Sequence, residues 1–171
     1  LEDQINSAEI KLHQIKNDRS SREKALHNLT NHLAQSLLAN EADGAFDMRD
    51  EDRPFKILIR GGEAYRVMEV LLGDLVCLFD SSNPASAFPG FIIHDCPREA
   101  DMSSGMYAKF FHLVERVEND FFKDFAPYQY IVSTTTPPPG SMQAMPYLRE
   151  TLDPSLDNGL LFKSRFRQPK E

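Results

Sequence analysis

A heptad pattern of apolar residues runs through the first forty residues of the chain. These residues are spaced alternately four and three positions apart, as in the seam of a coiled coil, and Arg19 and Arg22 fill the two remaining slots. The seam consists of Leu1, Ile5, Ala8, Leu12, Ile15, Leu26, Leu29 and Leu33. Because residues 1–40 contain no glycine or proline, the pattern predicts one continuous helix, about 60 Å long at about 1.5 Å per residue.

The narrow seam indicates how this helix is covered. Two apolar positions in every seven suit a coiled-coil partner helix, whereas a helix packed on its own domain has a wider apolar face. We therefore expect residues 1–40 to form a coiled-coil helix and residues 41–171 to form a separate lobe, with the helix packed on its own domain as the alternative. Since the seam is already in register at Leu1, we expect the natural chain to continue upstream.

Beyond this helix, short apolar runs alternate with amphipathic segments. Residues 41–53 are acidic and predict a loop. The segments after it predict a strand at 55–59, a largely buried helix at 63–79, a buried strand at 91–94, a helix at 106–125, a strand at 128–133 and a short strand or turn near 160–162. Helices that alternate with buried strands favour an α/β layer architecture with parallel pairing.

Composition narrows the classes of protein that fit. With 171 residues, of which 41% are hydrophobic and 26% charged, the chain can bury a core of ordinary size. It lacks an apolar run of about 18 residues and a secretion signal, and Cys77 and Cys96 lie inside apolar runs, so we expect a cytoplasmic protein without a membrane segment. A net charge of −7 argues against a broad nucleic-acid-binding surface.

Three segments carry candidate chemistry. The apolar run that ends at Asp95 delivers a carboxylate from a strand into a loop, as phosphate-handling proteins do to present an acid to Mg²⁺. Upstream, Gly61 and Gly62 open a long apolar helix, and downstream a second strand leads into residues 134–136, all threonines. In this order the three segments suggest half of a nucleotide-binding site.

This order of segments resembles the C-terminal lobe of an ABC-type ATPase head of the structural-maintenance-of-chromosomes (SMC) and recombination-repair superfamily, which includes RecF-like and RecN-like proteins. The resemblance covers about residues 1–139 and implies a mostly parallel sheet preceded by a long coiled-coil helix. It also implies ATP and Mg²⁺ as ligands. The partners it implies are an N-terminal P-loop lobe of the same protein, a second head in a homodimer, a coiled-coil partner helix and DNA. The chain has no G-x-x-x-x-G-K-[ST] string, as expected when the P-loop lies in the other lobe.

The resemblance assigns the glycine pair to the family's signature loop. Arg60, Gly61, Gly62 and Glu63 match a motif that usually reads Ser-Gly-Gly-Gln or Ser-Gly-Gly-Glu, with Arg60 at the serine position. Paired glycines let backbone N–H groups approach a γ-phosphate, and the helix supplies a positive dipole end. The structural alternative is a Gly-Gly turn from a strand into a helix.

The resemblance also assigns the acidic segment. Asp95 matches the Walker B aspartate that holds Mg²⁺, and Cys96 stands where most members have the glutamate that polarises water, so Glu99 is the candidate base. Asp101 falls close to the aspartate that contacts the opposite head, and Thr135 is a candidate γ-phosphate contact. The alternative for Asp95 is a strand-end aspartate that caps the next turn.

We therefore expect the C-terminal half of an ATPase that binds ATP and Mg²⁺ between two heads and hydrolyses ATP only together with its P-loop lobe. The resemblance implies DNA-related work in repair, chromosome organisation or defence against foreign DNA. A non-catalytic coiled-coil adaptor with an ATPase-like fold is the main alternative. A metal-dependent nuclease that uses Asp95, Glu99 and Asp101 is the third.

Overall fold

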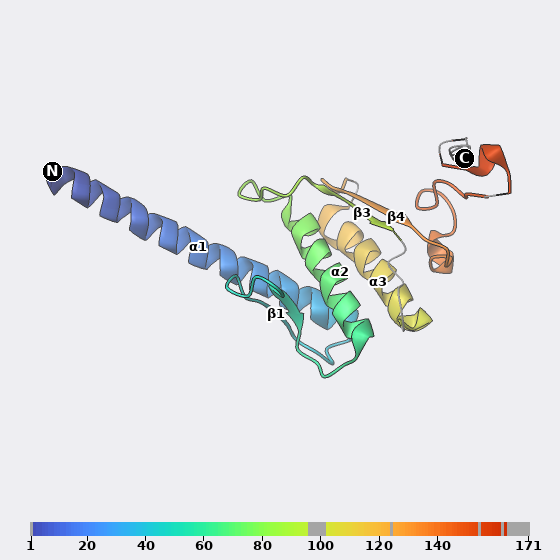
Figure 1. Ribbon diagram of the computed structural model, residues 1–171, viewed down its shortest axis with the longest axis horizontal. Coiled ribbons are helices and arrows are strands. Elements are labelled where there is room, and N and C mark those ends of the chain that lie inside the picture. Colours follow the sequence, from blue (N-terminus) through green and yellow to red (C-terminus); the bar gives the residue numbers. More distant parts are fainter. Residues whose placement is uncertain (1, 96–101, 124, 154, 162, 164–171) are drawn as a thin grey trace, which may run out of the picture. The chain divides into compact units, whose positions relative to one another are not determined.

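The computed structural model describes residues 2–95, 102–123, 125–153, 155–161 and 163. The chain divides into two compact units, Leu1–Thr136 and Pro137–Glu171. The first unit contains three helices and two small sheets, one antiparallel and one parallel, and is a small α/β fold (Figure 1). The α/β class predicted from the sequence is therefore confirmed.

The first helix, α1 (Glu2–Leu37), is continuous, as predicted. Its seam residues differ in burial along its length: Ile15 is 63% exposed, whereas Leu33 is 1% exposed. The C-terminal part of α1 contacts β1, α2 and α3 (Figure 1). The C-terminal part of the helix is thus packed on its own domain, while the seam of its N-terminal half is exposed; the coiled-coil partner stays a prediction.

A hairpin follows α1 where the sequence predicted an acidic loop. Strands β1 (Gly44–Phe46) and β2 (Phe55–Ile57) pair antiparallel. A Cβ atom at Gly44 would overlap the carbonyl oxygen of Thr30, so β1 lies directly on the backbone of α1. The prediction of a loop throughout residues 41–53 was wrong for Gly44–Phe46, because a strand of three residues that pairs with β2 leaves no recognisable local pattern.

Helices α2 (Glu63–Asp80) and α3 (Ser104–Val117) supply most of the core. The predicted bounds of α2, 63–79, agree with the observed ones except that the helix ends one residue later. The helix predicted at 106–125 begins two residues earlier and changes into a π-helical turn, Glu118–Phe122. The largest fully buried side chains are Phe110, Leu33, Leu37, Met68, Leu72, Leu75, Leu78 and Leu113. The core therefore forms where α1, α2 and α3 meet.

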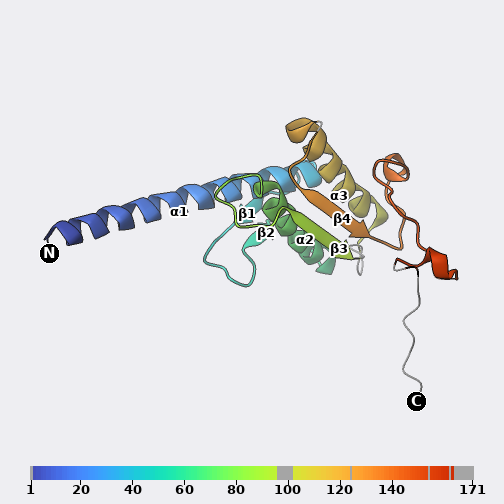
Figure 2. The same ribbon diagram turned by 90° about the horizontal axis from the view of Figure 1, so that it is seen from above.

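Strands β3 (Phe91–Asp95) and β4 (Gln129–Ser133) pair in parallel, as predicted, and lie side by side in Figure 2. Their residues alternate between an inner face, which includes His94 and Tyr130, and an exposed outer face. On the outer face Phe91 is 50% exposed and Ile93 is 62% exposed. The prediction that 91–94 is a buried strand was thus wrong for one of its two faces.

The second unit has little regular structure. Its described helical segments are the 3₁₀ turns Gly140–Met142 and Asp157–Gly159. The short strand or turn expected near residue 160 corresponds to the second of these turns, and residue 162 lies outside the described residues. In the described parts of both units, none of the helices has the length and apolar character needed to cross a membrane.

Candidate functional site

Asp95 lies at the carboxyl end of β3, where the strand leaves the sheet. Its register partner on β4 is Ser133, whose hydroxyl donates a hydrogen bond to the Asp95 carboxylate. Both residues belong to the exposed outer face. The parallel pair therefore holds the Asp95 carboxylate in a defined place while leaving it open to solvent. Sequence reasoning did not assign Ser133 to the site, although the parallel pairing it predicted places the two strand ends together.

Hydrogen bonds to Tyr107 and within the turn hold the segment that follows β4. The Thr134 hydroxyl lies 2.7 Å from the hydroxyl of Tyr107 and donates to the Thr136 carbonyl at 3.0 Å. The Thr136 N–H donates back to Thr134 Oγ1 at 3.1 Å, and Tyr107 is buried on α3. These bonds hold Thr134 as a structural residue and leave Thr135 exposed at the top of the turn.

The edge formed by Asp95, Ser133 and Thr135 offers oxygen ligands. Carboxylate and hydroxyl oxygens suit Mg²⁺, which keeps several waters and takes one or two carboxylates together with phosphate oxygens. Within the described ranges, no group of three or more His, Cys, Asp or Glu side chains is placed to hold a metal ion. The described donors could therefore supply only part of a Mg²⁺ coordination shell, and they do not form a closed metal cage.

The glycine pair lies at the other end of the α2 helix. Gly62 is the N-cap of α2. Its backbone has φ −83° and ψ −160°, an extended conformation that residues other than glycine also adopt. A Cβ at Gly61 would overlap the ring of Tyr65, whereas a Cβ at Gly62 would meet no described heavy atom within 4 Å. Gly61 is thus required by the fold, but the described structure gives no internal reason for a glycine at position 62.

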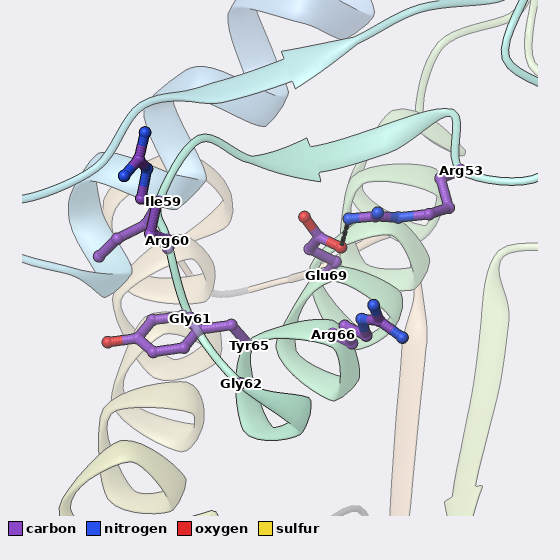
Figure 3. A pocket seen from close by; sticks show the side chains of 8 residues that line it. All are labelled: Arg53, Ile59, Arg60, Gly61, Gly62, Tyr65, Arg66 and Glu69. Carbon is purple, nitrogen blue, oxygen red and sulfur yellow. Dashed lines mark hydrogen bonds and ion pairs between the residues drawn. The ribbon is translucent and has the colours of Figure 1, made fainter.

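A pocket of about 320 Å³ surrounds this loop. Arginine side chains at positions 53, 60 and 66 line it together with Glu69 (Figure 3). Arg53 is tied to Glu69 at 2.5 Å, and Glu69 also accepts the Ile57 N–H at 3.0 Å. Arg60 and Arg66 extend in different directions in Figure 3. Arg53 pairs with Glu69 and Arg66 with Glu63, so the excess positive charge among the described lining residues comes from Arg60, which together with the N-terminus of α2 favours an anion.

The two candidate segments are far apart along α2. Asp74, which contacts the β3 strand through His94, is 12 residues beyond Gly62, or about 18 Å along the helix axis. The bond that ties β3 to α2 is therefore made well beyond the first turns of the helix and not at the glycine pair.

Several predicted site residues are not described. Cys96, Glu99 and Asp101 lie outside the described residues. Glu63 is the first residue of α2, and its carboxylate is 3.9 Å from the Arg66 guanidinium. The roles given to these residues stay predictions.

Comparisons with protein families, with curated proteins and with solved structures found no match for this chain. The function must therefore be argued from the residues and their geometry.

Proposed function

We propose that the chain is the C-terminal lobe of an SMC-like ABC ATPase head, which binds ATP and Mg²⁺ between two heads and couples binding and hydrolysis to work on DNA. One observation carries the proposal: a two-stranded parallel sheet presents Asp95 and Ser133 at its carboxyl edge, while its outer face is exposed. Ligands of α/β proteins bind at the carboxyl ends of parallel strands.

The small size of the parallel sheet and its exposed outer face support an N-terminal P-loop lobe as the partner. Parallel sheets are normally covered on both faces, and a sheet of two strands is marginal alone. Here α2 and α3 cover the inner face, whereas Phe91, Ile93 and Ile131 are exposed on the outer face. A second lobe that covers this face and extends the sheet would remove apolar surface from water and would bring its P-loop to Asp95.

The proposed roles follow from position. Asp95 would hold Mg²⁺, which supplies charge neutralisation on the phosphates when bound, and Ser133 orients the Asp95 carboxylate. Glu99 is the proposed base, because Cys96 is a poor one at neutral pH. Thr135 is exposed at the same edge and can donate a hydrogen bond to a phosphate.

The glycine pair would serve the nucleotide of the opposite head. An open backbone at Gly62, the dipole end of α2 and Arg60 all favour the approach of a γ-phosphate. Asp101 is the proposed second contact across the two heads. In this scheme the γ-phosphate joins the heads, and its loss after hydrolysis releases them.

The exposed seam of α1 supports a coiled-coil partner helix for its N-terminal half. DNA as the object of the work is supported by the family resemblance alone. Arg60 at the usual serine position and Cys96 at the usual glutamate position favour the second candidate, a non-catalytic adaptor.

Nucleotide binding by the full-length protein, or by this lobe co-expressed with its N-terminal partner, separates these candidates. We expect ATP binding that requires Mg²⁺ and is lost in Asp95→Ala. The control His112→Ala changes an exposed residue of α3 and is expected to bind as the unchanged protein does. Absence of Mg²⁺-dependent binding in the unchanged protein would refute the ATPase proposal and favour the adaptor.

A further inference from the structure

The imidazole of His94, on β3, contacts side chains of α2, β4 and α3. Its Nε2 lies 3.0 Å from the Oδ2 atom of Asp74 on α2, and its Nδ1 lies 2.9 Å from the hydroxyl of Tyr130 on β4. The ring of Phe110 on α3 packs beside it, with ring centroids 6.4 Å apart. His94 is mostly buried on the inner face of the sheet, where the neighbouring positions are apolar.

The chemistry of the partners settles one of the two bonds. A carboxylate can only accept, so Nε2 donates to Asp74. At Nδ1 the ring and the Tyr130 hydroxyl share a hydrogen bond whose donor depends on the tautomer of the ring. Burial raises the pKa of Tyr130, and the neighbouring Tyr107 and Asp74 add to this effect, so the hydroxyl keeps its proton. Both ring nitrogens are thereby satisfied.

A satisfied polar network fixes geometry more sharply than apolar packing does, because hydrogen bonds are directional. Replacing such a network by apolar residues of similar volume is often neutral for stability. The network therefore contributes mainly the orientation of the strand. His94 is followed directly by Asp95, and their side chains lie on opposite faces of β3. Holding the ring on the inner face thus sets the direction of the Asp95 carboxylate on the outer face.

We propose that His94 is a positioning residue for Asp95, and that Asp74 and Tyr130 hold its ring so that the carboxylate leaves β3 in the direction a bound Mg²⁺ requires. Ser133 holds the same carboxylate from the outer face. This inference rests on the proposed ATPase function. It adds a link between the strand that bears Asp95 and α2, the helix that begins at the glycine pair.

The test measures the Mg²⁺ concentration needed for half-maximal ATP binding by the full-length protein. His94→Leu is expected to raise this concentration about tenfold, as other losses of ligand orientation do. Tyr130→Phe is expected to give a smaller rise, and His94→Gln, which keeps a donor for Asp74, is expected to recover most of the affinity. At saturating Mg²⁺ the maximal ATP binding of the three variants should equal that of the unchanged protein.

Two matched controls accompany these variants. His112→Leu removes a histidine that pairs with Glu115 at 3.2 Å on the surface of α3. Tyr128→Phe removes a tyrosine hydroxyl just before β4 that has no hydrogen-bond partner among the described residues. Both are expected to keep the Mg²⁺ requirement of the unchanged protein. An unchanged requirement in His94→Leu and Tyr130→Phe, in a protein that binds Mg²⁺ and ATP, would overturn the inference alone. Failure of the unchanged protein to bind them would overturn the proposed function and this inference together.

The position of the proton gives a second readout that needs no nucleotide. In ¹⁵N NMR spectra of this chain we expect the His94 ring to carry its proton on Nε2. A ring without a proton on Nε2 would overturn the proposal, because it could not donate to Asp74.

Discussion

Arg22 of α1 and Asp80 of α2 form a bidentate ion pair between two helices. Arg22 Nη1 lies 2.6 Å from Asp80 Oδ1, and Nη2 contacts Oδ2. Both side chains are largely buried. The charge that interrupts the apolar seam at position 22 is thus explained by a partner within the same lobe.

We expect Arg22→Ala to lower the free energy of unfolding by about 2–3 kcal/mol, because it leaves Asp80 largely buried without its partner. Arg22→Lys should recover only part of this loss, since lysine cannot form the bidentate pair. Arg49→Ala removes an exposed pair with Asp47 and should leave stability essentially unchanged. Urea denaturation of Arg22→Ala, of Asp80→Ala and of the double variant that carries both changes measures the coupling energy between the two residues. Losses that add up in the double variant would contradict the pairing.

Two glycines separate folding from function. Gly44→Ala should destabilise the lobe by about 1–3 kcal/mol, because its Cβ would overlap the α1 backbone. Gly62→Ala should leave stability within about 0.5 kcal/mol, since its backbone is ordinary and its surroundings are open. We nevertheless expect Gly62→Ala to weaken ATP-dependent association of the heads, measured by sedimentation of the full-length protein. A strongly destabilised Gly62→Ala would show that this glycine serves the fold.

The outer face of the parallel sheet provides a test of the proposed P-loop lobe. Ile93→Lys should hardly alter the stability of this chain, because Ile93 is already exposed, but should abolish co-purification with the proposed lobe. Val70→Lys, at an exposed apolar position of α2, is the matched control and should co-purify normally. Normal co-purification of Ile93→Lys would mean that the P-loop lobe does not cover this face.

Ser133 is expected to affect Mg²⁺ through Asp95. Ser133→Ala should raise the Mg²⁺ concentration required for ATP binding about tenfold, because the carboxylate loses the donor that orients it. Ser133→Thr keeps the hydroxyl and should bind nearly as the unchanged protein does. Equal Mg²⁺ titrations for all three proteins would remove Ser133 from the site.

Two partly buried tyrosines should respond differently to loss of their hydroxyls. Tyr130→Phe should cost about 1 kcal/mol because the hydroxyl shares a hydrogen bond with His94, whereas Tyr128→Phe should be neutral or stabilising. Burial is the main cause that raises both pKa values above the usual 10.0. As the pH rises above 10.0, the unfolded tyrosines lose protons that the folded ones keep, so stability is lost. Thermal melts from pH 8 to 11 should show this loss, and it should shrink in both variants.

Much of the fold could be predicted because its signals are local. The glycine-free apolar seam located α1, and the apolar runs located α2 and the parallel pair. Strand β1 could not be predicted, because its three residues are too few to show a local pattern and it is defined by its pairing with β2. The exposed face of β3 was also missed. Apolar residues such as Phe91 and Ile93 look the same in the sequence whether or not another element covers that face of the strand.

The candidate site was predictable only in part. Asp95 and the glycine pair were found because a strand-end acid and paired glycines are visible in the sequence. Ser133 and the link from His94 to Asp74 depend on register and helix orientation, which no local pattern specifies. Nothing in the sequence distinguished Gly61 from Gly62; only the position of the Tyr65 ring does so.

The packing of α1 has a mechanical consequence. Its 36 residues span about 54 Å, and the end that carries Leu33 and Leu37 is wedged into the core while the other end is not. A stiff rod clamped at one end magnifies small tilts: turning the clamped end by about 10° sweeps the free tip through about 9 Å. A small rotation where α1 packs against α2 and α3 would thus become a large displacement of the N-terminal end of α1.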